Sequence, residues 1–244
     1  NSVGGKDQFD EVSILLDRTD KEDPGSNEEA MASLRVSVKS KNADLVGKMF
    51  SAKMIELALA NYPGFFIGGA VRSGGPVLVY WPALIDSKHI SETVHFDGKE
   101  TTILPTNQLG LEETYYQKQP IDIQPAPSDP SIKMPLGELF GARSGDKGGC
   151  ANIGVWAKTE NAYSFLNECL TVKKIKELMP DLAEFQIDRY ELPNILSLNF
   201  YIHGILEDGV SSNTRKDGQA KSLGEYLRAK YIEIPKSLIK EKEA

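Results

Sequence analysis

The residues of this chain best suited to chemistry lie in one short run, residues 141–154, which reads GARSGDKGGCANIG. A loop with several glycines can adopt positive φ repeatedly and turn backbone N–H groups toward one point, which forms a concavity for an anion. Arg143 can contact a carboxylate or phosphate through two hydrogen bonds, and Lys147 adds a point charge. The run therefore predicts an anion site. Its expected ligand-binding residues are Arg143, Ser144, Gly145, Lys147, Gly148 and Asn152.

The run matches neither common nucleotide-binding motif. A P-loop needs lysine followed by serine or threonine at the start of a helix, whereas Lys147 precedes Gly148 and no helical pattern begins there. The glycines are also wrongly spaced for a dinucleotide fingerprint, and no ribose-binding acidic residue follows. The alternative to an anion site is a tight hairpin in which Asp146 pairs with Arg143 or Lys147.

A second run, residues 209–221, reads GVSSNTRKDGQAK and leads into an expected helix. A helix N-terminus offers free N–H groups and a partial positive charge, so this hydroxyl-rich loop could also hold an anion. Its expected ligand-binding residues are Ser211, Arg215 and Lys221. The alternative is a solvated loop in which Asp217 caps the helix.

A row of polar residues interrupts the apolar stretch at residues 195–205. Asn199 and His203 are an even number of residues apart, so on one strand they share a face with Ser197 and Tyr201. An unpaired buried polar group costs about 1–3 kcal/mol, so this row must find partners. It predicts a site lining to which Asn199 and the adjacent Asn194 contribute; the alternative is a single histidine satisfied by neighbouring backbone.

Metal and thiol chemistry have weaker support. The three histidines show no His-x-x-x-His spacing and the cysteines no Cys-x-x-Cys spacing, so no metal and no cofactor is predicted. Two cysteines are too few for a disulfide framework, which favours a reducing compartment. Cys150, close in sequence to the cations Arg143 and Lys147, is a candidate nucleophile, but a packed cysteine at a strand start is the favoured alternative.

Composition excludes several classes of partner. The chain has 244 residues, 40% of them hydrophobic and 26% charged, with a net charge of −7, which opposes binding to nucleic acid. No apolar stretch approaches the length of a membrane span, and the start of the chain lacks a basic and apolar leader, so we expect a soluble cytoplasmic protein. The chain opens with Asn1 rather than Met, which suggests a processed product or part of a longer chain.

The elements that must position these residues have the pattern of two α+β domains, predicted at residues 1–104 and 134–244. Between them, residues 105–133 are rich in proline and read as an extended linker. In the first domain, alternation and β-rich runs predict strands at 11–18, 34–39, 65–71, 76–81 and 91–96, and apolar spacing predicts a helix at 42–60.

The second domain shows a mostly antiparallel pattern. We expect strands at 139–142, 152–157, 185–191 and 196–203, and helices at 162–170, 172–179 and 221–230. Thr171 is the expected cap of the second of these helices, and Pro180 ends it. The lysine-rich tail from Lys236 to Lys242 reads as a solvated terminus.

Several motifs in one order resemble the acyclic terpene utilisation (AtuA-like) family. They cover Met134 to Leu238. Residues 9–102, including Tyr80-Trp81-Pro82-Ala83-Leu84, look like the rear part of the family's larger N-terminal domain. The motifs are residues 142–149 and 151–154, then 189–194, Asn199-Phe200, 209–212, 215–221 and 227–230.

The resemblance implies a ferredoxin-like second domain that lacks most of its N-terminal partner domain. It implies a role in acyl-CoA or terpenoid-acid breakdown, with an anionic small molecule or acyl-CoA as ligand and a homo-oligomer as the assembly. Asp146 or His203 is the proton-transfer candidate for lyase or hydratase chemistry. Relatives often carry Asn or Asp at the position of Cys150, which argues against a catalytic thiol. The alternative function is a non-catalytic assembly or protein-interaction module of a larger enzyme.

Overall fold

The computed structural model of the chain describes residues 3–59, 63–69, 73–103 and 123–243. The chain divides into two compact units, residues 1–78 and 79–244, whereas the sequence predicts a boundary within residues 105–133. Most of that expected linker lies outside the described residues.

The first unit pairs a two-stranded ribbon with one helix. Strand β1 (Glu11–Asp17) runs antiparallel to β2 (Ser33–Lys39), as predicted. The predicted helix is broken: a π-helical segment (η3, Leu45–Met49), with non-helical backbone at Gly47, precedes α1 (Phe50–Leu59). Among the described side chains of this unit, Leu45 is the one buried hydrophobic residue, so the unit buries little apolar surface.

The strands predicted at 65–71 and 76–81 do not form within the described residues. Residues 63–69 turn, and residues 73–86 run extended without a partner strand. The side chains of Trp81 and Leu84 are exposed. A high β-propensity forms a strand only where a neighbouring strand gives the side chains a pleated surface to pack on, and no described segment does so here. The next predicted strand does form, as β3 (Glu92–Phe96) in a hairpin with β4 (Lys99–Ile103).

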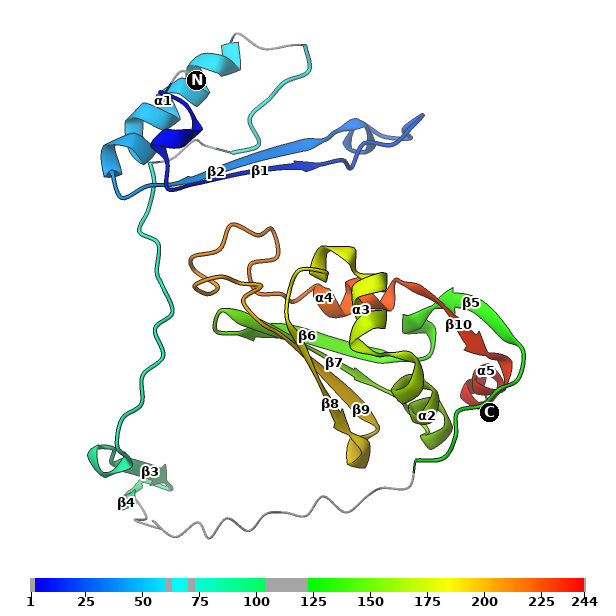
Figure 1. Ribbon diagram of the computed structural model, residues 1–244. Helices are drawn as coiled ribbons and strands as arrows, with labels where there is room; N and C mark the ends of the chain where they lie inside the picture. Colours follow the sequence, from blue (N-terminus) through cyan, green and yellow to red (C-terminus); the bar gives the residue numbers. More distant parts are fainter. Residues whose placement is uncertain (1–2, 60–62, 70–72, 104–122, 244) are drawn as a thin grey trace. The chain divides into compact units, whose positions relative to one another are not determined.

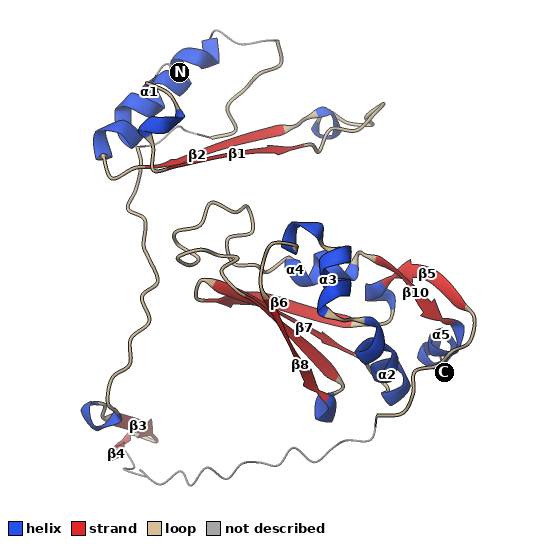
Figure 2. Cartoon of the chain, in the orientation of Figure 1, coloured by secondary structure: helices blue, strands red, loops and turns tan. Residues whose placement is uncertain are grey.

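The second unit is built on a four-stranded antiparallel sheet of order β6-β7-β9-β8. Helices α2 (Glu160–Cys169), α3 (Val172–Leu178) and α4 (Leu223–Arg228) all lie on one side of it (Figures 1 and 2). The strands are β6 (Gly141–Lys147), β7 (Cys150–Trp156), β8 (Ile187–Leu192) and β9 (Ser197–Ile202). Short helical turns are η1 (Lys6–Gln8), η2 (Glu28–Ala30), η4 (Ser87–His89), η5 (Leu136–Glu138), η6 (Pro180–Leu182) and η7 (Pro193–Ile195).

Alternation along the central strands decides which face is buried. Every second side chain of β7 and β9 points toward the helices and is fully buried, so the sheet has one core face. Among the described residues of this unit no helix covers the other face, and we call it the open face (Figure 2). The buried side chains of these two strands are Ala151, Ile153, Val155, Leu198, Phe200 and Ile202.

Arg189 fastens the end of α2 to β8. Its guanidinium donates to the carbonyl oxygens of Leu170 (3.1 Å) and Asn167 (2.8 Å), which lie in and just beyond the last turn of α2. It also pairs with the Glu191 carboxylate at 2.7 Å, and its side chain is only 18% exposed. These bonds satisfy carbonyl groups that a helix end leaves without intrahelical partners. The start of α3 is capped by Thr171, as predicted.

A second, two-stranded sheet completes the unit. Strand β5 (Ser131–Pro135) pairs antiparallel with β10 (Tyr231–Pro235), and helix α5 (Lys236–Glu243) follows directly. Asp129 accepts hydrogen bonds from the Ser237 N–H (2.9 Å) and hydroxyl (2.5 Å) at the start of α5. Leu238 is buried in the core, so the expectation of a solvated lysine-rich tail is wrong.

Candidate functional site

The glycine-rich run forms a β-hairpin. Strands β6 and β7 are joined by the two-residue turn Gly148-Gly149, with Lys147 opposite Cys150. Gly148 has φ of +65°, which the first central position of a type II′ turn requires. Because the strands pair along their whole length, the run does not form the predicted loop of converging N–H groups, and the hairpin alternative is confirmed. Its proposed ion pair is wrong, because Asp146 pairs with Lys221.

Alternation along β6 separates the predicted site residues onto two faces. Arg143, Gly145 and Lys147 lie on the open face, while Ser144 and Asp146 lie on the helix-covered side. The Ser144 hydroxyl donates to the Lys221 carbonyl at 3.0 Å and accepts from the Gly224 N–H at 2.8 Å. Ser144 therefore ties the start of α4 to β6, and its hydroxyl is already engaged.

The register aligns the open-face residues in rows across the four strands. The Asn152 side-chain amide donates to the Asn199 side-chain carbonyl at 2.9 Å, which joins two neighbouring rows. Three of the β6 and β7 positions on this face are glycine, and of these Gly141 is covered by Trp156 and Gly145 by Lys221. One row holds Arg143, Gly154, Asn199 and Tyr190, and the next holds Gly145, Asn152, Tyr201 and Asp188.

Lys221 brings a third cation to the same edge of the sheet. Its Nζ lies 3.3 Å from Asp146 Oδ1. A Cβ on Gly145 would lie 2.9 Å from that Nζ, so the ammonium sits directly over the glycine. The pKa of Asp146 is lowered, first by its own backbone N–H and then by Lys221. Asp146 is therefore an ionised group that positions Lys221.

A histidine–carboxylate pair lies at the other edge of the open face. His203 Nε2 is 2.7 Å from Asp188 Oδ2, and the Tyr201 ring packs edge-on against the imidazole with centroids 4.9 Å apart. The hydrogen bond with His203 is the main cause that lowers the pKa of Asp188. Such a pair orients an imidazole for proton transfer. Cys150, nearby, accepts a hydrogen bond from the Gly204 N–H at 3.4 Å.

The hairpin turn is packed rather than open. The Leu206 N–H donates to the Gly149 carbonyl at 2.9 Å, and Tyr80 donates its backbone N–H to the Asp208 carbonyl at 2.8 Å. A Cβ on Gly148 would lie 2.7 Å from the Tyr80 ring, so this glycine is needed for close approach as well as for its positive φ. The turn therefore acts as a packing contact for two other segments of the unit.

The second predicted loop, residues 209–221, is held by its own side chains. The Asn213 amide donates to the Gly209 (2.9 Å) and Gly218 (3.1 Å) carbonyls. Asp217 accepts from the N–H groups of Lys221 (2.9 Å) and Ser222 (2.8 Å), which directly precede α4. It therefore fixes the turn that leads into the helix, whereas the predicted cap of the helix itself is not seen, because Asp217 bonds none of the N–H groups of α4.

Replacing Asp217 with alanine should destabilise the second unit by about 1–2 kcal/mol, because the turn that leads into α4 loses its hydrogen bonds to the carboxylate. Burial raises the pKa of Asp217, but the hydrogen bonds from Ser222 and Lys221 outweigh it and the net pKa is lowered. A lowered pKa stabilises the fold above the unfolded-state value of about 3.9, and this stabilisation is lost as the pH falls through the folded-state pKa. Urea unfolding of Asp217→Ala and the parent chain at pH 7 and pH 3 measures both effects. An equal difference at both pH values would contradict this account.

The open face brings together seven of the thirteen predicted site residues and leaves six apart. Asn194 lies in η7, in the connection between β8 and β9, and is exposed. Ser211 is exposed in the 209–221 loop, and Arg215 is half-buried with its charge acting on Asp217. Ser144 and Asp146 lie on the helix-covered side of β6, and Gly148 lies in the hairpin turn. The residues brought together, counting Lys221 through its ammonium, are Arg143, Gly145, Lys147, Asn152, Asn199, His203 and Lys221.

Sequence reasoning missed two residues of this region, Asp188 and Tyr80, and one contact of a third, Tyr201. Asp188 carries no motif, and only the register of β8 against β9 places it near His203. Tyr201 was expected on the same face, but its packing against the imidazole was not. Tyr80 comes from a segment distant in sequence. Among the described residues, no group of three or more His, Cys, Asp or Glu side chains is placed to hold a metal ion. No helix in the described ranges has the length and apolar character to cross a bilayer.

Two family models match the chain. The AtuA ferredoxin-like domain matches residues 134–233, which include the four-stranded sheet and its open face. The acyclic terpene utilisation family protein AtuA matches residues 2–96. No curated protein and no solved structure matches the chain.

Proposed function

The chain belongs to the acyclic terpene utilisation family AtuA and carries its ferredoxin-like domain, and from this premise we propose that the open face binds an anionic ligand. The ligand is a carboxylate or the phosphate of an acyl-CoA, and the role lies in acyl-CoA or terpenoid-acid breakdown. The cationic side chains of the sheet attract the anion, and the absence of a side chain at Gly154 leaves room for it.

The observation that carries the proposal is the gathering of three cations along β6. Arg143 and Lys147 share the open face four residues apart, roughly 13 Å along the strand. The Lys221 ammonium lies between them over Gly145, and it comes from another segment of the chain. Arg143 makes no hydrogen bond or ion pair with another described residue, so its guanidinium is available to an anion.

The same face offers a group for proton transfer. His203 is held by Asp188, so its imidazole has a fixed orientation, as a general acid or base needs. In a lyase or hydratase step the imidazole would move a proton at the carbon next to a thioester carbonyl, while the β6 cations hold the anionic part of the substrate. Asp146 is the weaker candidate, because Lys221 and its own N–H stabilise its ionised form.

We expect Arg143→Ala to weaken the binding of coenzyme A about tenfold to a hundredfold, because it removes charged hydrogen bonds to the anion. Titration calorimetry of the full chain with coenzyme A measures the change. Lys173→Ala is the matched control, because Lys173 is an exposed cation on α3, on the covered side of the sheet. Equal affinity of the parent chain and Arg143→Ala would contradict the proposal.

A second candidate function, a non-catalytic assembly module, is favoured by the apolar residues at one end of the open face. The side chains of Tyr190 and Leu192 on β8 and of Trp156 on β7 are all more than a third exposed. Exposed aromatic and apolar residues on an uncovered sheet face suit contact with another protein surface. On this reading Arg143→Ala would alter the oligomeric state in sedimentation experiments and leave coenzyme A binding unchanged.

A further inference from the structure

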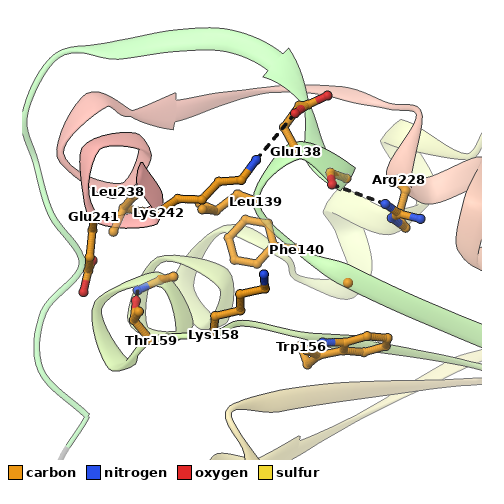
Figure 3. A pocket seen from close by; sticks show the side chains of 13 residues that line it. Glu138, Leu139, Phe140, Trp156, Lys158, Thr159, Arg228, Leu238, Glu241 and Lys242 are labelled. Atoms are coloured by element: carbon orange, nitrogen blue, oxygen red, sulfur yellow. Dashed lines mark hydrogen bonds and ion pairs between the residues drawn. The ribbon is translucent and has the colours of Figure 1, made fainter. Parts of the chain in front are cut away.

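A cavity of about 410 Å³ lies at the end of the β6–β7 hairpin that is remote from its turn. Its walls come from η5, the end of β7 with the start of α2, and helix α5 (Figure 3). It is separate from the β6 cations, because of the β6 residues only the first, Gly141, lines it.

One part of the cavity is apolar and rigid. Phe140 and Leu238 line it and are each 1% exposed, so core packing fixes their positions. Trp156 lies over Gly141, where a Cβ would come within 2.2 Å of the indole Cε2. The glycine therefore lets the indole lie flat against β6 and form a wall.

The cationic side chains of the cavity are not all neutralised. Lys242 pairs with Glu138 at 3.6 Å. Lys158 forms no hydrogen bond or ion pair with another described residue, and its ammonium points into the cavity below Phe140 (Figure 3). The Glu241 carboxylate lines the same cavity, but no described carboxylate forms an ion pair with Lys158.

Arg228 lines the cavity with a guanidinium that is already engaged. Its Nη1 pairs with Glu225 at 2.8 Å and its Nη2 lies 3.4 Å from the Gly137 carbonyl. Its Nε has no acceptor among the described residues, but this atom is buried, so a ligand in the cavity does not contact it. Lys158 is therefore the cation that the cavity offers to an anion.

We propose that this cavity binds a monocarboxylate with an apolar tail. The carboxylate lies against the Lys158 ammonium, and the tail lies against Trp156 and Phe140. A cavity of about 150 Å³ accommodates benzene, so this one has room for roughly 15 non-hydrogen atoms. The proposal does not depend on the proposed function, because its ligand contacts none of the β6 cations.

The test follows the fluorescence of Trp156 in a Trp81→Phe background. The chain has two tryptophans, and Trp81 is 85% exposed, so its removal leaves Trp156 as the reporter inside the cavity. Octanoate is the probe, and octanamide is the control of the same length without charge. We expect saturable binding of octanoate, with octanamide at least about tenfold weaker.

Two variants then locate the site. Lys158→Met keeps most of the side-chain length and should weaken octanoate binding about tenfold or more, without changing coenzyme A binding. Arg143→Ala should leave octanoate binding unchanged. Equal binding of octanoate and octanamide, no binding of octanoate at millimolar concentration, or an unaltered affinity in Lys158→Met would each overturn the proposal. Loss of octanoate binding in Arg143→Ala would move the ligand to the open face and overturn it as well.

Discussion

Replacing Gly149 with alanine is expected to destabilise the second unit by about 3 kcal/mol. The added Cβ would lie 2.1 Å from the backbone carbonyl oxygen of Glu207, and backbone cannot swing aside as a side chain can. The hairpin turn and the segment at residues 204–209 would have to separate, which breaks the Leu206-to-Gly149 hydrogen bond. Urea unfolding followed by Trp156 fluorescence in the Trp81→Phe background measures the loss.

Gly154→Ala is the matched control for this prediction. A Cβ on Gly154 would lie 3.8 Å from its nearest neighbour, the Arg143 carbonyl oxygen, which is ordinary contact. Alanine costs less conformational entropy in a strand than glycine, so this variant should be as stable as the parent chain or slightly more stable. Equal losses for the two variants would show that the close approach at Gly149 is not the cause.

Arg189→Ala should also cost about 3 kcal/mol, because it leaves the carbonyl groups at the end of α2 without partners and a carboxylate unpaired. Glu191, the carboxylate concerned, is half-buried. Thermal or urea unfolding of the full chain measures the effect. Binding of coenzyme A is not expected to change in the folded fraction, because Arg189 points toward the helices and away from the open face.

Arg189→Lys separates charge from geometry. Lysine keeps the positive charge but lacks the planar fork that reaches Leu170, Asn167 and Glu191 together, so it should recover less than half of the lost stability. Lys173→Ala, which removes an exposed cation from α3, should change stability by less than about 0.5 kcal/mol. Full recovery by lysine would mean that charge alone accounts for the role of Arg189.

In the second unit, sequence periodicity predicted the strands and helices that each have one buried face. The alternation in β9 and the cap at Thr171 are readable because burial and capping act on neighbouring residues. Strand β6 is shorter in the prediction than in the structure, because the polar and glycine residues from Arg143 onward have low strand propensity. Pairing with β7 outweighs that propensity.

Sequence analysis did not predict helix α5, because the composition of this segment gives no sign of its tertiary contacts. Its lysines and glutamates suggest a solvated tail, but two residues decide otherwise: Leu238 enters the core, and Ser237 is bound by Asp129, more than a hundred residues earlier. The predicted strand at 76–81 fails for the opposite reason, because its apolar residues find no partner ladder among the described residues. Both errors concern contacts between distant segments.

The residues of the candidate site were easier to predict than their arrangement. Arg143, Lys147 and Asn199 could be selected by type and spacing, since alternation within one strand fixes the face of each. The approach of Lys221 to Gly145 and of Asp188 to His203 depends on edge packing and strand register, which no local pattern specifies.

The β5–β10 ladder brings the two ends of the segment from Ser131 to Pro235 together. Because Ser131 pairs with Pro235, the chain enters the ferredoxin-like fold and leaves its last strand at the same place. Folds whose ends adjoin tolerate insertion into other chains and circular permutation, since a short joint can bridge the old ends without strain. The segment from Ser131 to Pro235 therefore begins and ends at the same place. Evolution or an engineer could insert it into another polypeptide without altering the sheet.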